Sequence, residues 1–174
     1  GSAMVKAALC LGFFGLLRIG ELTAGKKEVN PSLTMGSLTW KQGFLEVKLW
    51  SSKTDRTSQG VTVKVPRTGS SICPFSAVER YLRERPSRGG RALFLWPDGT
   101  PLTAWDLRKE LKAGCLRAGI HGNINGHSLR IGGTTALAQK GASVEQIMQH
   151  GRWKSDSIRH SEGSLAGVAS LMDN

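Results

Sequence analysis

Three short segments carry polar side chains that could do chemistry, and the first is LLRIGEL. Its Arg18 ends a stretch otherwise built from Leu, Phe and Ala, and Glu21 follows three residues later. A buried guanidinium without an anionic partner is very costly, so Arg18 needs one. Glu21 could be that partner, since a helix would place it on the same face. The segment alone does not distinguish a structural ion pair from a binding site.

The other two segments are GHSLRIGG and the basic stretch around SSKTDRTSQG. His127 and Arg130 are three residues apart and project together on a helix, but most isolated pairs of this kind are surface residues. Lys53 lies at the expected tip of a hairpin between Leu38 and Thr68, where six basic residues accompany two acidic ones. This hairpin is either a solvated loop or a lysine-bearing finger that reaches into a DNA groove.

The composition favours a polyanionic partner. The chain has 174 residues and a net charge of +11, and 39% of its residues are hydrophobic. This length fits one domain with a packed core, and so large an excess of positive charge favours nucleic acid over a merely basic surface. No apolar run reaches membrane-spanning length, and no Asp, Glu or His cluster has metal-site spacing. The three cysteines form no CxxC pair, which favours a reducing, intracellular compartment.

The elements that must position these side chains are mainly helical. The segment 5–22 is apolar nearly all round, which predicts a buried central helix. The stretches LTW, FLEVKLW and VTVKVP predict three short antiparallel strands between residues 38 and 66, with a first turn at Lys41-Gln42-Gly43. Gly1-Ser2-Ala3-Met4 resembles the remnant of a cleaved tag, so residues 1–4 are left out of the expected fold and 5–174 form the domain.

Helix start signals mark the second half of the chain. Cys73-Pro74 predicts a helix over 74–85 with proline in its first turn. Thr103 with Asp106, and Ser143 with Gln146, are typical of capping boxes that open further helices. A helix is also expected over 127–141, and a last one over 156–172.

The order of these segments resembles the catalytic domain of the tyrosine recombinases, the phage integrase family. The matching pieces are LGFFGLLRIGELT, SSKTDRTSQGVTV, RTGSSICPFSAVERYL, DGTPLT, GHSLRIGGTTALAQKG and GRWKSDS. They extend over residues 5–161, and their wording is closest to recombinases of DIRS-type and Crypton-type transposons. The resemblance implies a mostly α (α+β) fold, in which a helical bundle carries a small three-stranded antiparallel sheet.

The resemblance also implies DNA strand transfer without a metal or other cofactor. In this family a tyrosine attacks a phosphodiester, and a 3′-phosphotyrosyl bond stores the energy for rejoining. Arg18 and Arg130 would hold the two non-bridging oxygens, because guanidinium groups bind them bidentately. His127 would donate a hydrogen bond and assist proton transfer, and Lys53 would protonate the leaving 5′-oxygen. Glu21 would orient Arg18.

The segment GRWKSDSIRHS departs from the family pattern at one position. Family members of this type read GRWxSDxxxxY, in which Trp153 would pack on or hydrogen-bond the phosphate; a strict register would place Arg152 there instead. Eight residues after the tryptophan this chain has Ser161 where the family has the nucleophilic tyrosine. A serine hydroxyl is shorter by a whole ring and would not reach a phosphate positioned for tyrosine. The resemblance therefore implies a recombinase that lacks its nucleophile.

Two explanations of Ser161 remain open. An engineered substitution is favoured, because the other polar active-site residues are intact; natural decay into a non-catalytic DNA-binding module is the alternative. Tyr81, the only tyrosine, lies on a different helix and is expected to be a packing residue. His160 as a substitute nucleophile and a type IB topoisomerase activity are weaker hypotheses. His121 and His150 are expected to be surface or helix-end residues.

The implied partner is double-stranded DNA. Basic residues beside the catalytic set are expected to contact it: Lys48, Arg56, Lys64, Arg67 and Lys154. The sequence is not expected to include the N-terminal core-binding domain that completes a clamp in the family, so weak and salt-sensitive binding is expected of it. The tail EGSLAGVASLMDN could dock on a neighbouring subunit in a tetrameric synapse or pack on its own domain. The expected location is intracellular, and nuclear for a eukaryotic element.

Overall fold

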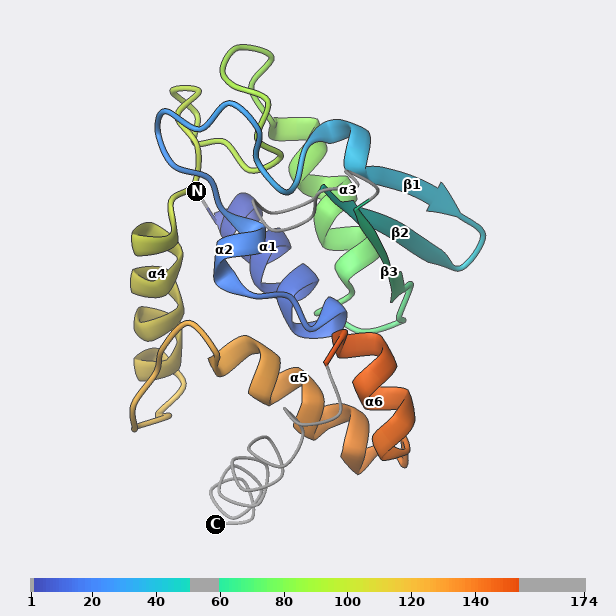
Figure 1. The fold of residues 1–174 in the computed structure, drawn as a ribbon. Coiled ribbons are helices and arrows are strands. Elements are labelled where there is room, and N and C mark those ends of the chain that lie inside the picture. The colour runs from blue at the N-terminus through green and yellow to red at the C-terminus, as the bar shows by residue number, and fades with distance from the viewer. Residues whose placement is uncertain (1, 51–59, 154–174) are drawn as a thin grey trace.

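The computed structural model describes residues 2–50 and 60–153. In chain order they form α1 (Ser2–Gly15), α2 (Ile19–Leu22), a 3-10 turn (Met35–Ser37), β1 (Leu38–Lys41), β2 (Phe44–Leu49), β3 (Val61–Pro66), α3 (Pro74–Glu84), α4 (Ala104–Arg117), α5 (Ser128–Gln139) and α6 (Val144–Gly151). Figure 1 shows α1 in the middle, with the sheet and α3 on one side, α4 on the other, and α5 and α6 across its end. The expected mostly helical fold with a small sheet is confirmed.

The sheet is antiparallel in the order β1-β2-β3, as the strand pattern predicted. Val47 of β2 pairs with Val63 of β3, and both are buried against the core. The next pair along these strands, Glu46 and Lys64, lies on the opposite face of the sheet. Gly43 makes the first turn with a φ of +85°, a conformation that glycine adopts at no steric cost. The sheet therefore has one apolar face on α1 and one polar, outer face.

α1 is the centre of the hydrophobic core. Ala7, Ala8 and Leu11 have no exposed surface, because α3, α5 and β3 all pack against this helix. Tyr81 of α3 is also buried; its hydroxyl donates to the Leu93 carbonyl oxygen at 2.9 Å and accepts from the Leu95 N–H at 2.8 Å. Tyr81 is thus a packing residue, as expected.

The first helix does not continue to residue 22, and this part of the prediction is wrong. α1 ends at Gly15, and Leu16 turns the chain with a φ of +51°. The Leu17 N–H reaches back to the Gly12 carbonyl oxygen at 2.9 Å, the bond pattern that ends many helices. Leu16 is completely buried, and that burial offsets the cost of a left-handed leucine. The apolar pattern hid the break because the turn is as apolar as the helix.

The start of α1 also differs from the expectation. The helix begins at Ser2, and Met4 is 4% exposed in the core cluster, so residues 2–4 belong to the fold. None of the described helices has the length and apolar character needed to cross a membrane. The expected helix over 156–172 lies outside the described residues.

The helix start signals are largely confirmed. The Cys73 thiol accepts from the Ser76 N–H, and Ser143 and Gln146 bond reciprocally. Thr103 caps α4 through the Asp106 N–H at 3.2 Å. The Asp106 carboxylate instead accepts from the indole N–H of Trp96 at 3.2 Å, so only half of this capping box forms.

Candidate active site

Arg130 lies in the first turn of α5 and is 5% exposed. Its guanidinium carbon is 4.3 Å from the centroid of the Trp153 ring, and its Nη2 donates to the Gly151 carbonyl oxygen. Among residues 2–50 and 60–153, its buried Nε finds no hydrogen-bond partner. Burial, then the charges of Arg18 and Arg152, lower the pKa of Arg130 to about 10, so it stays charged at neutral pH. A buried cation with a vacant donor is suited to binding an anion.

The turn after α6 presents three of the groups around Arg130. Arg152 adopts a left-handed conformation, with φ +61° and ψ 33°, and the Trp153 N–H bonds the Met148 carbonyl oxygen at 3.0 Å. This reversal brings the Gly151 carbonyl and the Trp153 ring to Arg130. A Cβ at Gly151 would lie 2.6 Å from the Trp153 ring, so only glycine lets the indole fold back here.

Glu21 pairs with Arg152 across 131 residues of sequence. The Glu21 oxygens accept from both terminal nitrogens of Arg152, at 2.7 and 2.8 Å, and the two side chains are 19% and 22% exposed. Burial acts to raise the pKa of Glu21, but hydrogen bonds from Arg152 and the Arg18 N–H outweigh it and hold the pKa below its ordinary value. The carboxylate is ionised and fully engaged.

The expectation that Glu21 orients the Arg18 side chain needs correction. Glu21 instead accepts the backbone N–H of Arg18 at 2.9 Å, as a cap of the short helix α2. The reason is the break after α1, which makes Arg18 the residue before α2 rather than a residue within a longer helix. Its exposed side chain lies near enough to Arg130 to lower that residue's pKa. We call Arg18, Arg130 and Arg152, with Glu21, the guanidinium cluster.

Close packing of α1 against α5, and a hydrogen bond from α6 to the end of α1, position this cluster. A Cβ at Gly133 would lie 2.1 Å from the Phe13 carbonyl oxygen, so the backbones of α1 and α5 touch there. His150, at the end of α6, bonds the Phe14 carbonyl oxygen through Nε2 at 2.7 Å. His150 was expected only as a surface or helix-end residue. No local pattern indicated that its ring would tie α6 to the end of α1.

His127 immediately precedes α5 and is exposed. Its backbone N–H donates to the Asn125 side chain at 2.9 Å, and its own side chain does not cap the helix. It lies one turn before Arg130, as its spacing predicted. Several predicted site residues lie outside the described part of the chain: Lys53, Arg56, Lys154 and Ser161.

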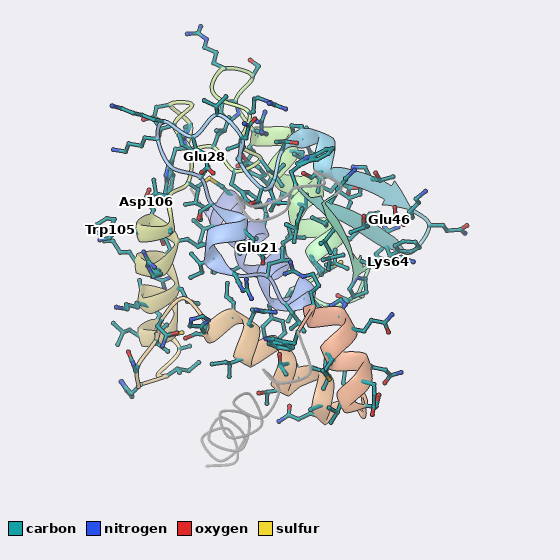
Figure 2. The ribbon with its side chains drawn as sticks, viewed as in Figure 1. Glu21, Glu28, Glu46, Lys64, Trp105 and Asp106 are labelled. Carbon is teal, nitrogen blue, oxygen red and sulfur yellow. The ribbon has the colours of Figure 1, made fainter. Side chains whose placement is uncertain are left out.

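A second group of cations lies on the sheet. Lys48 is 4.3 Å from the centroid of the Trp50 ring, and Lys64 is 5.4 Å from that of Phe44. Arg67, just after β3, lies 5.0 Å from the centroid of the Phe75 ring. Figure 2 shows Lys64 on the sheet, well apart from Glu21 in α2. These three, the sheet cations, do not join the guanidinium cluster.

The described residues contain no group of three His, Cys, Asp or Glu that could hold a metal ion. The polar and aromatic groups of the described site are its three arginines, Trp153 and the Glu21 carboxylate. Such a site binds an oxyanion through hydrogen bonds and charge.

Comparison with known proteins assigns the family. The model described as "Phage integrase family" matches residues 2–160. The chain belongs to this family of tyrosine recombinases. No curated protein sequence matches the chain.

Solved structures of several recombinases and integrases share the fold. XerH site-specific recombinase bound to difH substrate, in a pre-cleavage complex, has a TM-score of 0.70 and 20% identity over 98% of this chain and 46% of its own. XerA recombinase has a TM-score of 0.64 and 14% identity, covering 99% of this chain and 63% of its own. The Tn1549 transposon integrase in complex with circular intermediate DNA has a TM-score of 0.61 and 19% identity, covering 91% of this chain and 52% of its own. The chain thus spans about half the length of XerH.

Proposed function

We propose that the chain is the catalytic domain of a site-specific recombinase that cleaves and rejoins DNA strands. The observation that carries the proposal is Arg130, a buried, charged guanidinium with a vacant Nε beside the exposed Arg18. Family membership supports a phosphodiester as its anion. The solved relatives XerH and the Tn1549 integrase are described in complexes with DNA, which supports double-stranded DNA as the substrate.

In the proposed chemistry, the guanidinium cluster stabilises the negative charge that develops on the phosphate. A tyrosine oxygen attacks the phosphorus, the bond from phosphorus to the 5′-oxygen breaks, and a 3′-phosphotyrosyl bond forms. Arg18 and Arg130 stabilise the charge that develops on the non-bridging oxygens, and Trp153 fixes the plane of Arg130 by stacking on it. His127 donates a hydrogen bond, and Lys53 gives its proton to the leaving oxygen. Attack by that oxygen in reverse rejoins a strand.

In this chain the nucleophile position is Ser161. Tyr81 cannot substitute for it, since its hydroxyl is buried and bonded to the backbone at Leu93 and Leu95. The chain therefore binds the phosphate without attacking it, and we favour an engineered replacement of tyrosine. The alternative function, a DNA-binding module without catalysis, uses the same cluster, because holding a phosphate needs no nucleophile.

The biological setting is part of the same proposal. The motifs are most similar to those of DIRS-type and Crypton-type recombinases, which favours an origin in a transposable element of that type. Such an element would place the protein inside the cell, and in the nucleus of a eukaryote. Lambda integrase is described both as a dimer on a core site and as a tetramer on a Holliday junction. We extend this to self-association of the present chain in a tetrameric synapse on DNA, with the C-terminal tail as the candidate contact between subunits.

The test restores the nucleophile. The Ser161→Tyr variant is mixed with duplexes that carry a nick near a randomised core, so that cleavage releases a short fragment and traps the protein. A detergent-stable adduct to the 3′-phosphate side of the break is expected with Ser161→Tyr and not with Ser161. The proposal fails if the variant forms no adduct while Arg18→Ala and Arg130→Ala leave DNA binding unchanged.

A further inference from the structure

We propose that Arg152 is a positioning residue whose guanidinium occupies Glu21 and so keeps Arg18 and Arg130 free for the DNA phosphate. The inference rests on the proposed function and assigns a role within the same site. It differs from a direct role of Arg152 on the phosphate, which the strict register of the GRW segment had left open.

The first argument is the saturation of the pair. Both terminal nitrogens of Arg152 are bonded to Glu21, at 2.7 and 2.8 Å, and the pair is four-fifths buried. A bidentate arginine–carboxylate pair of this kind is strong and geometrically specific. While it persists, both terminal nitrogens of Arg152 are used, and only its buried Nε is left without a partner among the described residues. Arg152 therefore acts on Glu21 rather than on DNA.

The second argument is the position of Glu21 among the other cations. Burial and the charges of Arg18 and Arg152 lower the pKa of Arg130, and the negative charge of Glu21 partly opposes them, so Glu21 and Arg130 interact through space. It also bonds the backbone of Arg18 at 2.9 Å. A buried carboxylate without a partner is costly, so a Glu21 released from Arg152 would turn to Arg18 or Arg130. It would then compete with the phosphate for the same donors.

The third argument is the backbone of Arg152. Its φ of +61° lies in the region where glycine is free of strain and an arginine is not. The turn after α6 would form more readily with glycine, which is also the usual residue at this position of such a turn. Arginine at this position therefore has a conformational cost that glycine would avoid, and the bond to Glu21 offsets part of it.

Because the backbone conformation of Arg152 suits glycine, the side chain can be removed without disturbing the turn. Arg152→Gly removes the guanidinium and keeps the left-handed turn that presents Trp153. Glu21→Gln removes the charge and keeps an oxygen that can accept the Arg18 N–H. Glu28 provides the matched control, because it is exposed and accepts the Gly25 N–H three residues before it at 2.9 Å, just as Glu21 accepts that of Arg18. Figure 2 shows Glu28 away from Glu21.

The experiment measures single-turnover cleavage at saturating DNA in the Ser161→Tyr background. Arg152→Gly is expected to slow cleavage by about 10- to 100-fold, a loss within the range of a displaced catalytic donor. Adding Glu21→Gln to Arg152→Gly is expected to restore the rate to within about threefold, as the competitor is then gone. Adding Glu28→Gln, which changes the net charge equally, is expected to restore nothing.

Two results would overturn the inference. If the Arg152→Gly, Glu21→Gln double variant stays as slow as Arg152→Gly, Arg152 contacts the DNA itself. If both double variants recover equally, net charge alone is responsible. Thermal unfolding identifies a merely structural role, in which the rate per folded molecule would be the same in all variants.

The inference can be separated from the proposed function. If Ser161→Tyr forms no adduct with any DNA, the function fails, and the affinity of the unaltered Ser161 chain for a mixed-sequence duplex still tests Arg152. Arg152→Gly should then weaken binding several-fold, and Glu21→Gln but not Glu28→Gln should reverse that loss. Equal affinities in all four proteins would contradict the inference by itself.

Discussion

The guanidinium cluster and the sheet cations are both positively charged, but the fold holds them in opposite ways. Arg130 is 5% exposed and is fixed by a ring, a carbonyl and the packing of three helices. Lys64 is exposed on the outer face of β3, and its contact is the Phe44 ring at 5.4 Å. One group is therefore preorganised at a cost in desolvation, whereas the other remains largely solvated.

The difference teaches which group can do chemistry. A donor stabilises a transition state strongly only if it is already oriented and shielded from water, as Arg130 is. An exposed lysine attracts DNA from a distance, and salt screens that attraction. We expect the cluster to act on one phosphate and the sheet cations to add general affinity.

The largest expected effect separates the two groups by rate. In the Ser161→Tyr background, Arg130→Lys should lower single-turnover cleavage by about 100- to 1,000-fold, since one ammonium cannot replace an oriented guanidinium. Lys64→Gln should change the same rate less than about threefold at saturating DNA. Quenched-flow assays of adduct formation measure the cleavage rates of both variants. Equal losses of rate would contradict the distinction between the guanidinium cluster and the sheet cations.

The next effect concerns the packing under the cluster. Gly133→Ala places a Cβ 2.1 Å from the Phe13 carbonyl oxygen and should destabilise the fold by about 1–3 kcal/mol. Gly114→Ala, inside α4 with only the Arg117 side chain within 4 Å, should instead stabilise it by about 0.5–1 kcal/mol. Urea unfolding of both variants checks the signs. A neutral Gly133→Ala would mean that α1 and α5 are not in contact there.

A smaller effect is expected in the salt dependence of DNA binding. Lys64→Gln should lower affinity a few-fold and reduce the slope of log affinity against log salt by about 0.9, if Lys64 meets one phosphate. Lys64→Arg keeps the charge and serves as the control. Fluorescence titrations at several salt concentrations give the slope, and an unchanged slope in Lys64→Gln would remove Lys64 from the DNA-binding surface.

The smallest effect is a pH dependence that belongs to the cluster. The pKa of Glu21 in the folded chain lies below its ordinary value of 4.5, so the stability that it contributes is present above that pH. It is lost as the pH falls through the lowered pKa. The melting temperature of the chain should exceed that of Glu21→Gln at pH 7, and the gap should close below pH 4.5. A gap that stays constant with pH would contradict the pairing with Arg152.

Local signals in the sequence predicted much of this molecule. The three strands, the turn at Gly43 and the capping box of Ser143 with Gln146 all depend on residues close together in the chain, and all are confirmed. The break at Leu16 was missed because a buried turn and a buried helix have the same apolar composition.

The assembly of the site could be predicted only in part. Motif order brought Arg18, Arg130 and Trp153 into one hypothesis; in the structure the Trp153 ring lies 4.3 Å from the guanidinium of Arg130, and Arg18 is near enough to lower the pKa of Arg130. The bond between Glu21 and Arg152 joins residues 131 positions apart, and a sequence pattern predicts only contacts between residues close together in the chain. Its geometry depends on a left-handed arginine, which sequence patterns do not indicate.

The central claim, that the guanidinium cluster holds a DNA phosphate, is tested most directly by following the arginine Nε–H signals of the unaltered chain by NMR. The Nε of Arg130 is buried and has no acceptor in the part of the chain that the structure describes, so a phosphate that binds there would be a new acceptor for it. On titration with a short duplex, the Arg130 and Arg18 signals should shift strongly and saturate together. If they stay in place while signals around Lys64 shift, DNA binds the sheet and the cluster is not its phosphate site.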